Sequence, residues 1–246
     1  MAVGTESTWF RRYPVTRPRA RLLCLPHAGG SASFFHPWGH ALGADVEVLV
    51  ARYPGRLERI AEPCVEHMEP LAEAVTQEIL PFLDVPLMVF GHSMGASLAY
   101  EVGLRLEKEH GTALARLFVS ARRPPHKVVP SQAYLGGDDA LIAEVRRLGG
   151  TDSSLLDDPD MRELVLPAIR ADFRIVGTYE PRPPVALGCP IVAYAGDSDP
   201  AVNMTDMRAW RDVATGGFAA REFHGGHFYL TGQRPALLRD LAARMA

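Results

Sequence analysis

Cysteine is scarce in this chain of 246 residues, which contains only Cys24, Cys64 and Cys189. The three lie far apart and none belongs to a C-x-x-C pair, so the sequence predicts neither a disulfide framework nor a zinc site. Cysteine usage of this kind is typical of the reducing cytoplasm, and we expect a cytoplasmic protein.

Strong charge and long apolar runs are also missing. The formal net charge of −3 gives no electrostatic reason to expect binding to nucleic acid or to a membrane. No run approaches the ~18 apolar residues of a membrane span, and residues 1–19 lack the apolar segment of a signal peptide. Hydrophobic residues make up 47% of the chain, enough for a sizeable core, and we expect one domain over residues 1–246.

Short apolar runs alternate with segments of helical periodicity. The expected strands are Arg21–Leu25, Val46–Ala51, Pro86–Phe90, Leu117–Ser120, Ile191–Ala195 and Phe218–Phe223. The expected helices between and after them are Met68–Leu83, Met94–Glu109 (with Gly111 as its cap), Met204–Val213 and Pro235–Met245. This alternation predicts an α/β fold with a mostly parallel central sheet that is flanked by helices on both faces.

One stretch interrupts the alternation. Between Pro124 and Pro184 there is no convincing strand, but Asp138–Leu148 and Pro159–Tyr179 have helical patterns, and prolines bracket the region. We expect a helical insertion at about 124–184 that acts as a lid over the strand ends. An ordinary packed helical subdomain is the alternative.

The most informative motif is Gly91-His92-Ser93-Met94-Gly95, which lies between an expected buried strand and an expected helix. This is the pattern of a nucleophile elbow, a turn so tight that glycine is needed two residues to each side of the serine. A serine hydroxyl is a weak nucleophile until a base activates it. We therefore predict that Ser93 is a catalytic nucleophile; a solvated serine in a glycine turn is the alternative.

The base and its supporting acid are expected in the chain order Ser, Asp or Glu, His. An acidic turn with Asp197 and Asp199 follows one expected strand, and a glycine loop with His224 and His227 follows the next. We favour Asp199, which lies further out on its turn, while Asp197 could cap the turn that follows. We favour His227 as the base because Gly225 and Gly226 allow it to approach the serine.

An oxyanion hole is the remaining requirement, because charge that develops on a carbonyl oxygen needs preorganised donors. The backbone N–H of Met94 should supply one donor. The glycine-rich loop after the first strand should supply the other, which we assign to the N–H of Ala28. His92 is expected to pack the elbow and His27 to be a satisfied structural histidine. These parts require no metal or cofactor.

Taken together, these motifs resemble the type II (editing) thioesterases of polyketide synthase and nonribosomal peptide synthetase systems, which have an α/β-hydrolase fold with a mobile helical lid. The resemblance rests on Pro26-His27-Ala28-Gly29-Gly30, Tyr53-Pro54-Gly55-Arg56, Gly91-His92-Ser93-Met94-Gly95-Ala96, Ser120-Ala121-Arg122-Arg123-Pro124-Pro125, Gly196-Asp197-Ser198-Asp199-Pro200 and Gly225-Gly226-His227-Phe228, in this order. It spans nearly the whole chain, without a departure at a catalytic position.

The resemblance implies hydrolysis of stalled, often short, acyl groups from the phosphopantetheine arm of an acyl or peptidyl carrier protein. A general carboxylesterase or lipase acting on free esters is the alternative enzyme, since one triad serves both; a hydrolase fold used only for binding is a third possibility. We expect a freestanding monomer. Arg56, Arg122 and Arg123 could bind the carrier, or could simply be solvated, and the Met94 side chain could line an acyl pocket.

Overall fold

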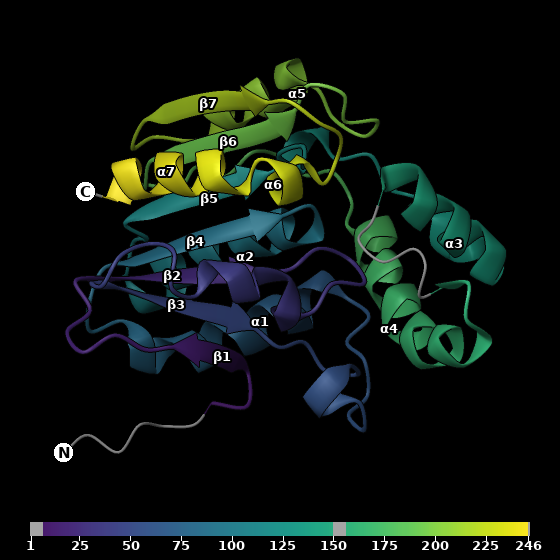
Figure 1. The fold of residues 1–246 in the computed structure, drawn as a ribbon. Helices are drawn as coiled ribbons and strands as arrows, with labels where there is room; N and C mark the ends of the chain where they lie inside the picture. Colours follow the sequence, from purple (N-terminus) through teal and green to yellow (C-terminus); the bar gives the residue numbers. More distant parts are fainter. Residues whose placement is uncertain (1–6, 150–155, 246) are drawn as a thin grey trace.

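A seven-stranded sheet in the order β1-β3-β2-β4-β5-β6-β7 forms the centre of the computed structural model, which describes residues 7–149 and 156–245 (Figure 1). Neighbouring strands from β3 to β7 run parallel. Their bounds are β2 Ala20–Leu25, β3 Val46–Ala51, β4 Leu87–His92, β5 Arg116–Ser120, β6 Ile191–Gly196 and β7 Phe218–Phe223. These six strands confirm the sequence prediction, with ends shifted by two residues at most.

The seventh strand, β1 (Phe10–Tyr13), was not predicted. It pairs antiparallel with β3 at the edge of the sheet, where Phe10 lies opposite Ala51. Its sequence is Phe-Arg-Arg-Tyr, which contains no apolar run, and only its two aromatic ends are buried. An edge strand of this kind carries too little hydrophobic pattern to be found from the sequence.

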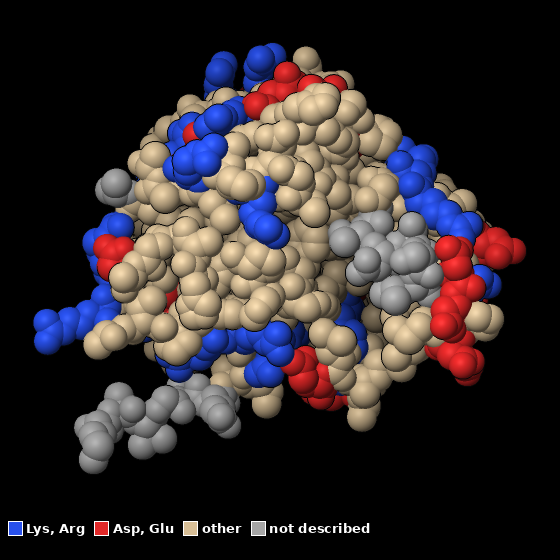
Figure 2. Space-filling view, in the orientation of Figure 1, with Lys and Arg blue, Asp and Glu red and all other residues tan. Residues whose placement is uncertain are grey.

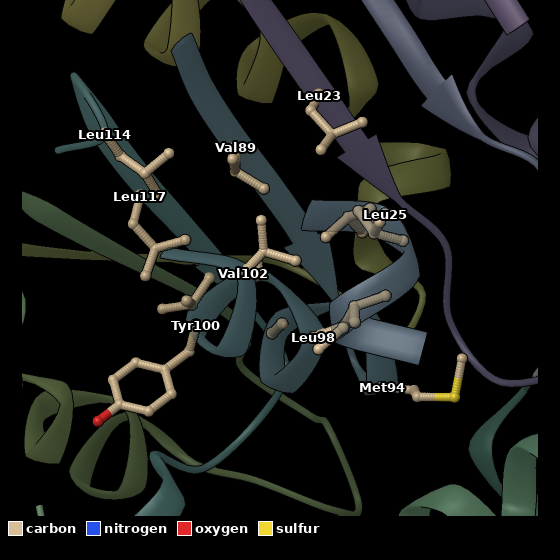
Figure 3. Close-up of a cluster of buried hydrophobic side chains, with 14 of the residues drawn as sticks. Leu23, Leu25, Val89, Met94, Leu98, Tyr100, Val102, Leu114 and Leu117 are labelled. Atoms are coloured by element: carbon tan, nitrogen blue, oxygen red, sulfur yellow. The ribbon is translucent and has the colours of Figure 1, made fainter. Parts of the chain in front are cut away.

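The sheet is buried on both faces, which is why its central strands read as continuous apolar runs. Alternate residues of β2 enter opposite cores: Leu23 and Leu25 pack in one, Leu22 and Cys24 in the other. Helices α1 (Met68–Ile79) and α2 (Met94–His110) cover the first face, and Figure 3 shows leucines and valines of α2 and the strands packed together there. Helix α7 (Arg234–Met245) and the 3₁₀ helix Ala32–Trp38 cover the second face.

Helix ends follow local chemistry. Gly111 ends α2 in the left-handed conformation (φ +62°), as predicted. Pro81 follows closely after α1 and has no backbone N–H to continue it, so Leu80–Phe82 forms a 3₁₀ turn in place of the longer predicted helix. The predicted helix Met204–Val213 is likewise divided into α5 (Met204–Arg208) and a 3₁₀ turn. The short helix α6 (Tyr229–Gly232) was not predicted.

Two helices form the insertion between β5 and β6, as predicted: α3 (Gly137–Leu148) and α4 (Pro159–Thr178). No strand occurs in the described part of residues 124–184. The two helices lie beyond the arrowhead ends of the central strands, at the right of Figure 1. They have a hydrophobic cluster of their own, formed by Leu141, Ile142, Leu156, Leu166, Ile169 and Phe173.

On the face drawn in Figure 2, charged side chains lie mainly around the rim, with basic ones grouped along the lower edge and acidic ones at the right, and the centre is mostly uncharged. Among the helices that the structure describes, none combines the length and the apolar character needed to cross a membrane. Cys24, Cys64 and Cys189 are all free thiols.

Candidate active site

The turn that carries Ser93 connects β4 directly to α2. Ser93 has φ +54° and ψ −118°, a conformation that L residues rarely adopt and that stores about 1–3 kcal/mol. A Cβ atom on Gly91 would lie 2.0 Å from the carbonyl oxygen of Gly95, and one on Gly95 would lie 2.0 Å from that of Leu25. Both glycines are therefore required by close backbone approach, as the elbow motif predicts.

The neighbouring strand holds this strained turn in place. The Ser93 N–H donates to the carbonyl of Ser120 at the end of β5, at 2.8 Å. Beneath the turn, His92 Nδ1 lies 2.9 Å from the Ser120 hydroxyl, which lies 2.8 Å from the hydroxyl of Tyr229. Burial, followed by the neighbouring imidazoles of His227 and His27, lowers the pKa of His92 well below 6.5. His92 is therefore a neutral packing residue, as expected.

Asp199 and His227 come together from the loops after β6 and β7. Asp199 Oδ2 lies 2.9 Å from His227 Nδ1, and both side chains are almost completely buried. The other carboxylate oxygen, Oδ1, accepts the N–H of Ala201 at 2.8 Å. An ionised Asp199 requires the proton of a neutral imidazole to be on Nδ1, which leaves Nε2 as a lone-pair acceptor. Within residues 7–149 and 156–245, Nε2 has no hydrogen-bond partner.

His227 and Ser93 line the same cavity, of about 480 Å³. Ala28, from the loop after β2, lines it as well. The volume lies within the ~300–1,000 Å³ range of small-ligand pockets. The structure thus brings the predicted nucleophile, base and one predicted oxyanion donor to one place.

The competing acid and base form a separate pair. Asp197 Oδ2 lies 3.0 Å from His224 Nδ1, and its Oδ1 accepts the N–H of Gly225 at 3.0 Å. That amide, with the His224 ring second, lowers the pKa of Asp197. His224 is 86% exposed, and neither residue lines the cavity. Asp197 therefore braces the two loops against each other.

The predicted oxyanion donors lie on a helix start and on a tight turn. Met94 is the first residue of α2, where backbone N–H groups have no partner inside the helix. Its side chain is fully buried in the core and does not line the cavity, so the expectation that it forms an acyl pocket is wrong. The loop of Ala28 is closed by a 2.9 Å hydrogen bond from the Gly30 N–H to the His27 carbonyl.

His27 departs from its expected role as a satisfied histidine. Its ring packs edge-on against Phe34 and Phe228, each with a centroid separation of 4.7 Å. In the part of the chain that the structure describes, its buried Nδ1 has no hydrogen-bond partner. Burial, with smaller contributions from His227 and Arg56, lowers its pKa to about 3. It is a neutral ring beside the site.

The insertion supplies much of the cavity wall. Phe173 and Val176 come from α4, while Glu144 and Arg147 come from α3 and form an ion pair at 2.7 Å. The cavity also contains Arg122, whose Nε donates to the Ser97 hydroxyl at 3.0 Å. The insertion thus forms part of the site. It is not a subdomain that only packs against the rest of the chain.

The three arginines considered for carrier binding are all engaged within the chain. Arg56 forms a buried ion pair with Asp172, Arg123 pairs with Asp206 at 2.9 Å, and Arg122 bonds to Ser97. None is a simple solvated side chain. Asp172 was not among the residues predicted from the sequence. Helical periodicity signals only its burial, since Asp172 lies on the apolar stripe of α4, three residues after Ile169, where a carboxylate needs a partner that the pattern does not identify.

Fold and site together define a serine hydrolase of the α/β-hydrolase class. The chain belongs to the thioesterase family, because the family model described as "Thioesterase domain" matches residues 20–245.

Relatives of known structure or curated function narrow this further. The chain is 43% identical over 236 residues to Thioesterase PikA5 of Streptomyces venezuelae, covering 95% of this chain and 84% of that protein. The structure of the type II thioesterase BorB from the borrelidin biosynthetic cluster matches with a TM-score of 0.89 and 41% identity, covering 97% of this chain and 98% of that one. YbtT, a type II thioesterase from the yersiniabactin pathway, matches at 0.84 with 27% identity over 96% of this chain and 97% of that one. The resemblance to type II thioesterases is confirmed.

Proposed function

We propose that this protein is a type II thioesterase that hydrolyses stalled or aberrant acyl groups from the phosphopantetheine arm of acyl or peptidyl carrier proteins. The observation that carries the proposal is the buried Asp199–His227 pair. His227 lines the cavity that Ser93 also lines, and its Nε2 has no hydrogen-bond partner among the described residues. Family membership supplies the thioester class, and the relatives supply the biosynthetic setting.

In the first half of the reaction, the Ser93 oxygen attacks the thioester carbonyl while His227 Nε2 takes the hydroxyl proton. Asp199 stabilises the imidazolium and keeps the ring in its orientation. The N–H groups of Ala28 and Met94 bind the oxyanion of the tetrahedral intermediate. When the carbon–sulfur bond breaks, the proton passes from Nε2 to the departing pantetheine thiolate, and the acyl group remains on Ser93.

In the second half, water replaces the thiol. His227 Nε2 takes a proton from the water as its oxygen attacks the acyl-serine carbonyl, and the same two N–H groups bind the second oxyanion. The ester bond to Ser93 breaks, Nε2 returns the proton to the serine oxygen, and the free acid leaves. Residues of this chain perform each step, and the pantetheine belongs to the carrier substrate.

The insertion of residues 124–184 has the role of a lid in this account. Its helices α3 and α4 form walls of the cavity, and their facing sides form a hydrophobic cluster of their own, while Ile175 near the end of α4 belongs to a core of the sheet. The part of the lid that packs only on its own cluster can move while Ile175 keeps the end of α4 on the sheet. We further propose that the enzyme acts as a monomeric single domain on carrier proteins in the cytoplasm.

The test compares one short acyl group on two leaving groups, a carrier protein and a phenyl ester. The account predicts a higher kcat/KM for the carrier-bound thioester, and loss of both activities in Ser93→Ala. Comparable or faster hydrolysis of the ester, without preference for the carrier, would make the protein a general esterase.

A further inference from the structure

A buried carboxylate outside the predicted triad lies between the insertion and the loop of Ala28. Asp172, in α4, is 1% exposed and accepts three hydrogen bonds. The Gly29 N–H donates to Oδ2 at 2.7 Å, Arg56 Nη1 donates to the same oxygen at 2.6 Å, and Arg56 Nη2 donates to Oδ1 at 2.8 Å. Asp172 thus holds the residue that directly follows the predicted oxyanion donor.

Arg56 completes the clamp from the other side of the loop. Its Nη1 also donates to the Gly30 carbonyl at 3.0 Å, and its guanidinium lies 5.4 Å from the centre of the Tyr53 ring. The Tyr53 hydroxyl donates to the Pro26 carbonyl at 3.2 Å. Burial opposes the guanidinium charge, but Asp172 raises the pKa of Arg56, so the guanidinium stays charged. The loop from residue 26 to residue 30 is therefore tied at both ends.

Helix α4 also contacts this loop directly. Gly29 has φ +75°, and a Cβ atom there would lie 3.0 Å from Ile169 Cγ1. The Ala28 side chain packs against the hydrophobic cluster of the insertion. A shift of α4 would therefore move both the carboxylate that binds the Gly29 N–H and the surface on which Ala28 rests.

An ion pair is a poor way to gain stability here. Two charges lose their hydration on burial, and apolar side chains of similar volume often stabilise a protein as well or better. What apolar packing cannot supply is direction, because only a hydrogen bond fixes how a peptide group is oriented. The two hydrogen bonds to Gly29 and Gly30 are directional: one acts on the N–H of the Ala28–Gly29 peptide group and the other on the carbonyl of the Gly30–Ser31 peptide group.

We propose that Asp172 and Arg56 are positioning residues that orient the oxyanion-binding N–H of Ala28, so that the seating of helix α4 sets the reactivity of Ser93. The inference rests on the proposed function, since it concerns the same site. It goes beyond that function, because it makes the rate of the reaction depend partly on a contact between the insertion and the loop after β2.

The experiment compares variants by the rate at which a fluorophosphonate probe labels Ser93, together with kcat and KM on an acyl-carrier protein. Asp172→Asn keeps the size of the side chain but loses its charge and one acceptor. We expect the labelling rate and kcat to fall about 10- to 100-fold. Removal of a whole oxyanion donor costs ~10²–10³-fold, and a misoriented donor should cost less. KM should change less than threefold, and the pH midpoint of labelling should stay in place because Asp199 and His227 are untouched.

Glu47→Gln is the matched control. Glu47 is also a buried carboxylate, 2% exposed, and accepts hydrogen bonds from Arg12 and Arg21. It lies near the N-terminal end of β3, whereas Ser93 follows the C-terminal end of the parallel strand β4. We expect this variant to lose thermal stability as Asp172→Asn does but to label at the wild-type rate. Equal labelling rates for Asp172→Asn and Glu47→Gln would overturn the inference.

The double variant Arg56→Met/Asp172→Leu separates orientation from stability. It removes both charges, so neither is left buried without a partner, and it should remain folded. We expect labelling still at least tenfold slower than wild type; a folded double variant with the wild-type rate would overturn the inference. Wild-type labelling at Ser93 without hydrolysis of acyl-carrier protein would refute only the proposed function, whereas wild type that is not labelled at Ser93 would refute both.

Discussion

Asp199 and His227 meet at 2.9 Å in a setting almost closed to solvent, whereas Asp197 and His224, only a few residues away, meet at 3.0 Å on the open surface. The two pairs have the same chemistry and the same parent loops. Burial and the shared cavity with Ser93 distinguish them, because a buried carboxylate fixes and stabilises an imidazolium that water would otherwise solvate.

This contrast predicts opposite results for two similar substitutions. Asp199→Asn should lower kcat by about 10³–10⁴-fold, since the amide no longer favours the tautomer with a free Nε2. Asp197→Asn should change kcat less than threefold and mainly loosen the loops after β6 and β7. Steady-state kinetics on an acyl-carrier protein measures both. A larger loss of kcat in Asp197→Asn would show that Asp197, and not Asp199, supports the catalytic histidine.

A second prediction concerns the elbow glycine. Gly95→Ala would place a Cβ atom 2.0 Å from the Leu25 carbonyl oxygen, and neither backbone segment can move without opening the sheet. We expect a loss of more than about 4 kcal/mol in the free energy of unfolding, or no folded protein.

Gly232→Ala is the control for that substitution. A Cβ atom on Gly232, in α6, would have nothing within 4 Å. Alanine should therefore leave the free energy of unfolding unchanged or raise it by up to about 1 kcal/mol. Urea denaturation compares the two variants, and similar losses in both would contradict the close approach at Gly95.

A third prediction uses the low pKa of His27. In the unfolded chain this residue binds a proton near pH 6.5, but in the folded protein only near pH 3. Since the unfolded state then binds more protons, stability is complete above pH 6.5 and falls as the pH drops below it. Between pH 7 and pH 5, His27 should account for about 2 kcal/mol of that fall.

His27→Gln removes this titration, so its free energy of unfolding should decrease by about 2 kcal/mol less than that of wild type over the same interval. Urea denaturation at pH 7 and at pH 5 measures the difference. Equal decreases in the two proteins would show that His27 is protonated as easily in the folded state as in the unfolded chain.

A fourth prediction concerns chain length. Val176 of α4 lines the cavity, so Val176→Phe should narrow it. Hydrolysis of a long acyl group, such as octanoyl, should fall at least tenfold in kcat/KM, while acetyl should fall less than threefold, because only the longer chain meets the new ring. Equal losses for the two acyl-carrier substrates would place the acyl chain elsewhere.

Much of the fold could be predicted from the sequence because the sheet is buried on both faces. Strands such as β2 and β3 are therefore mostly apolar, interrupted only by Arg21 and Glu47, which pair with each other, and Pro26 follows the end of β2. Strand β1 lacked that signal, since two arginines separate its buried aromatics. The helix break at Leu80 follows from Pro81, which apolar periodicity alone does not take into account, while the break at Ala209 depends on local backbone geometry.

The site divides in the same way. Ser93, Asp199 and His227 follow from motif and chain order, because each stands at a strand end. The partner of Arg56 could not be predicted, since Asp172 lies 116 residues further along and meets it only through the path of α4. Long-range pairs of this kind depend on tertiary packing, and a motif that contains one member does not identify the other.

The central claim is that Ser93 carries the acyl group between its removal from the carrier and its hydrolysis. The most direct test mixes the enzyme with an acyl-carrier protein, quenches the mixture in acid within one turnover, and identifies the acylated peptide by mass spectrometry. The account predicts the acyl mass on Ser93 and no turnover in Ser93→Ala. Undiminished turnover in Ser93→Ala, with no acyl group on Ser93 in the wild type, would contradict it.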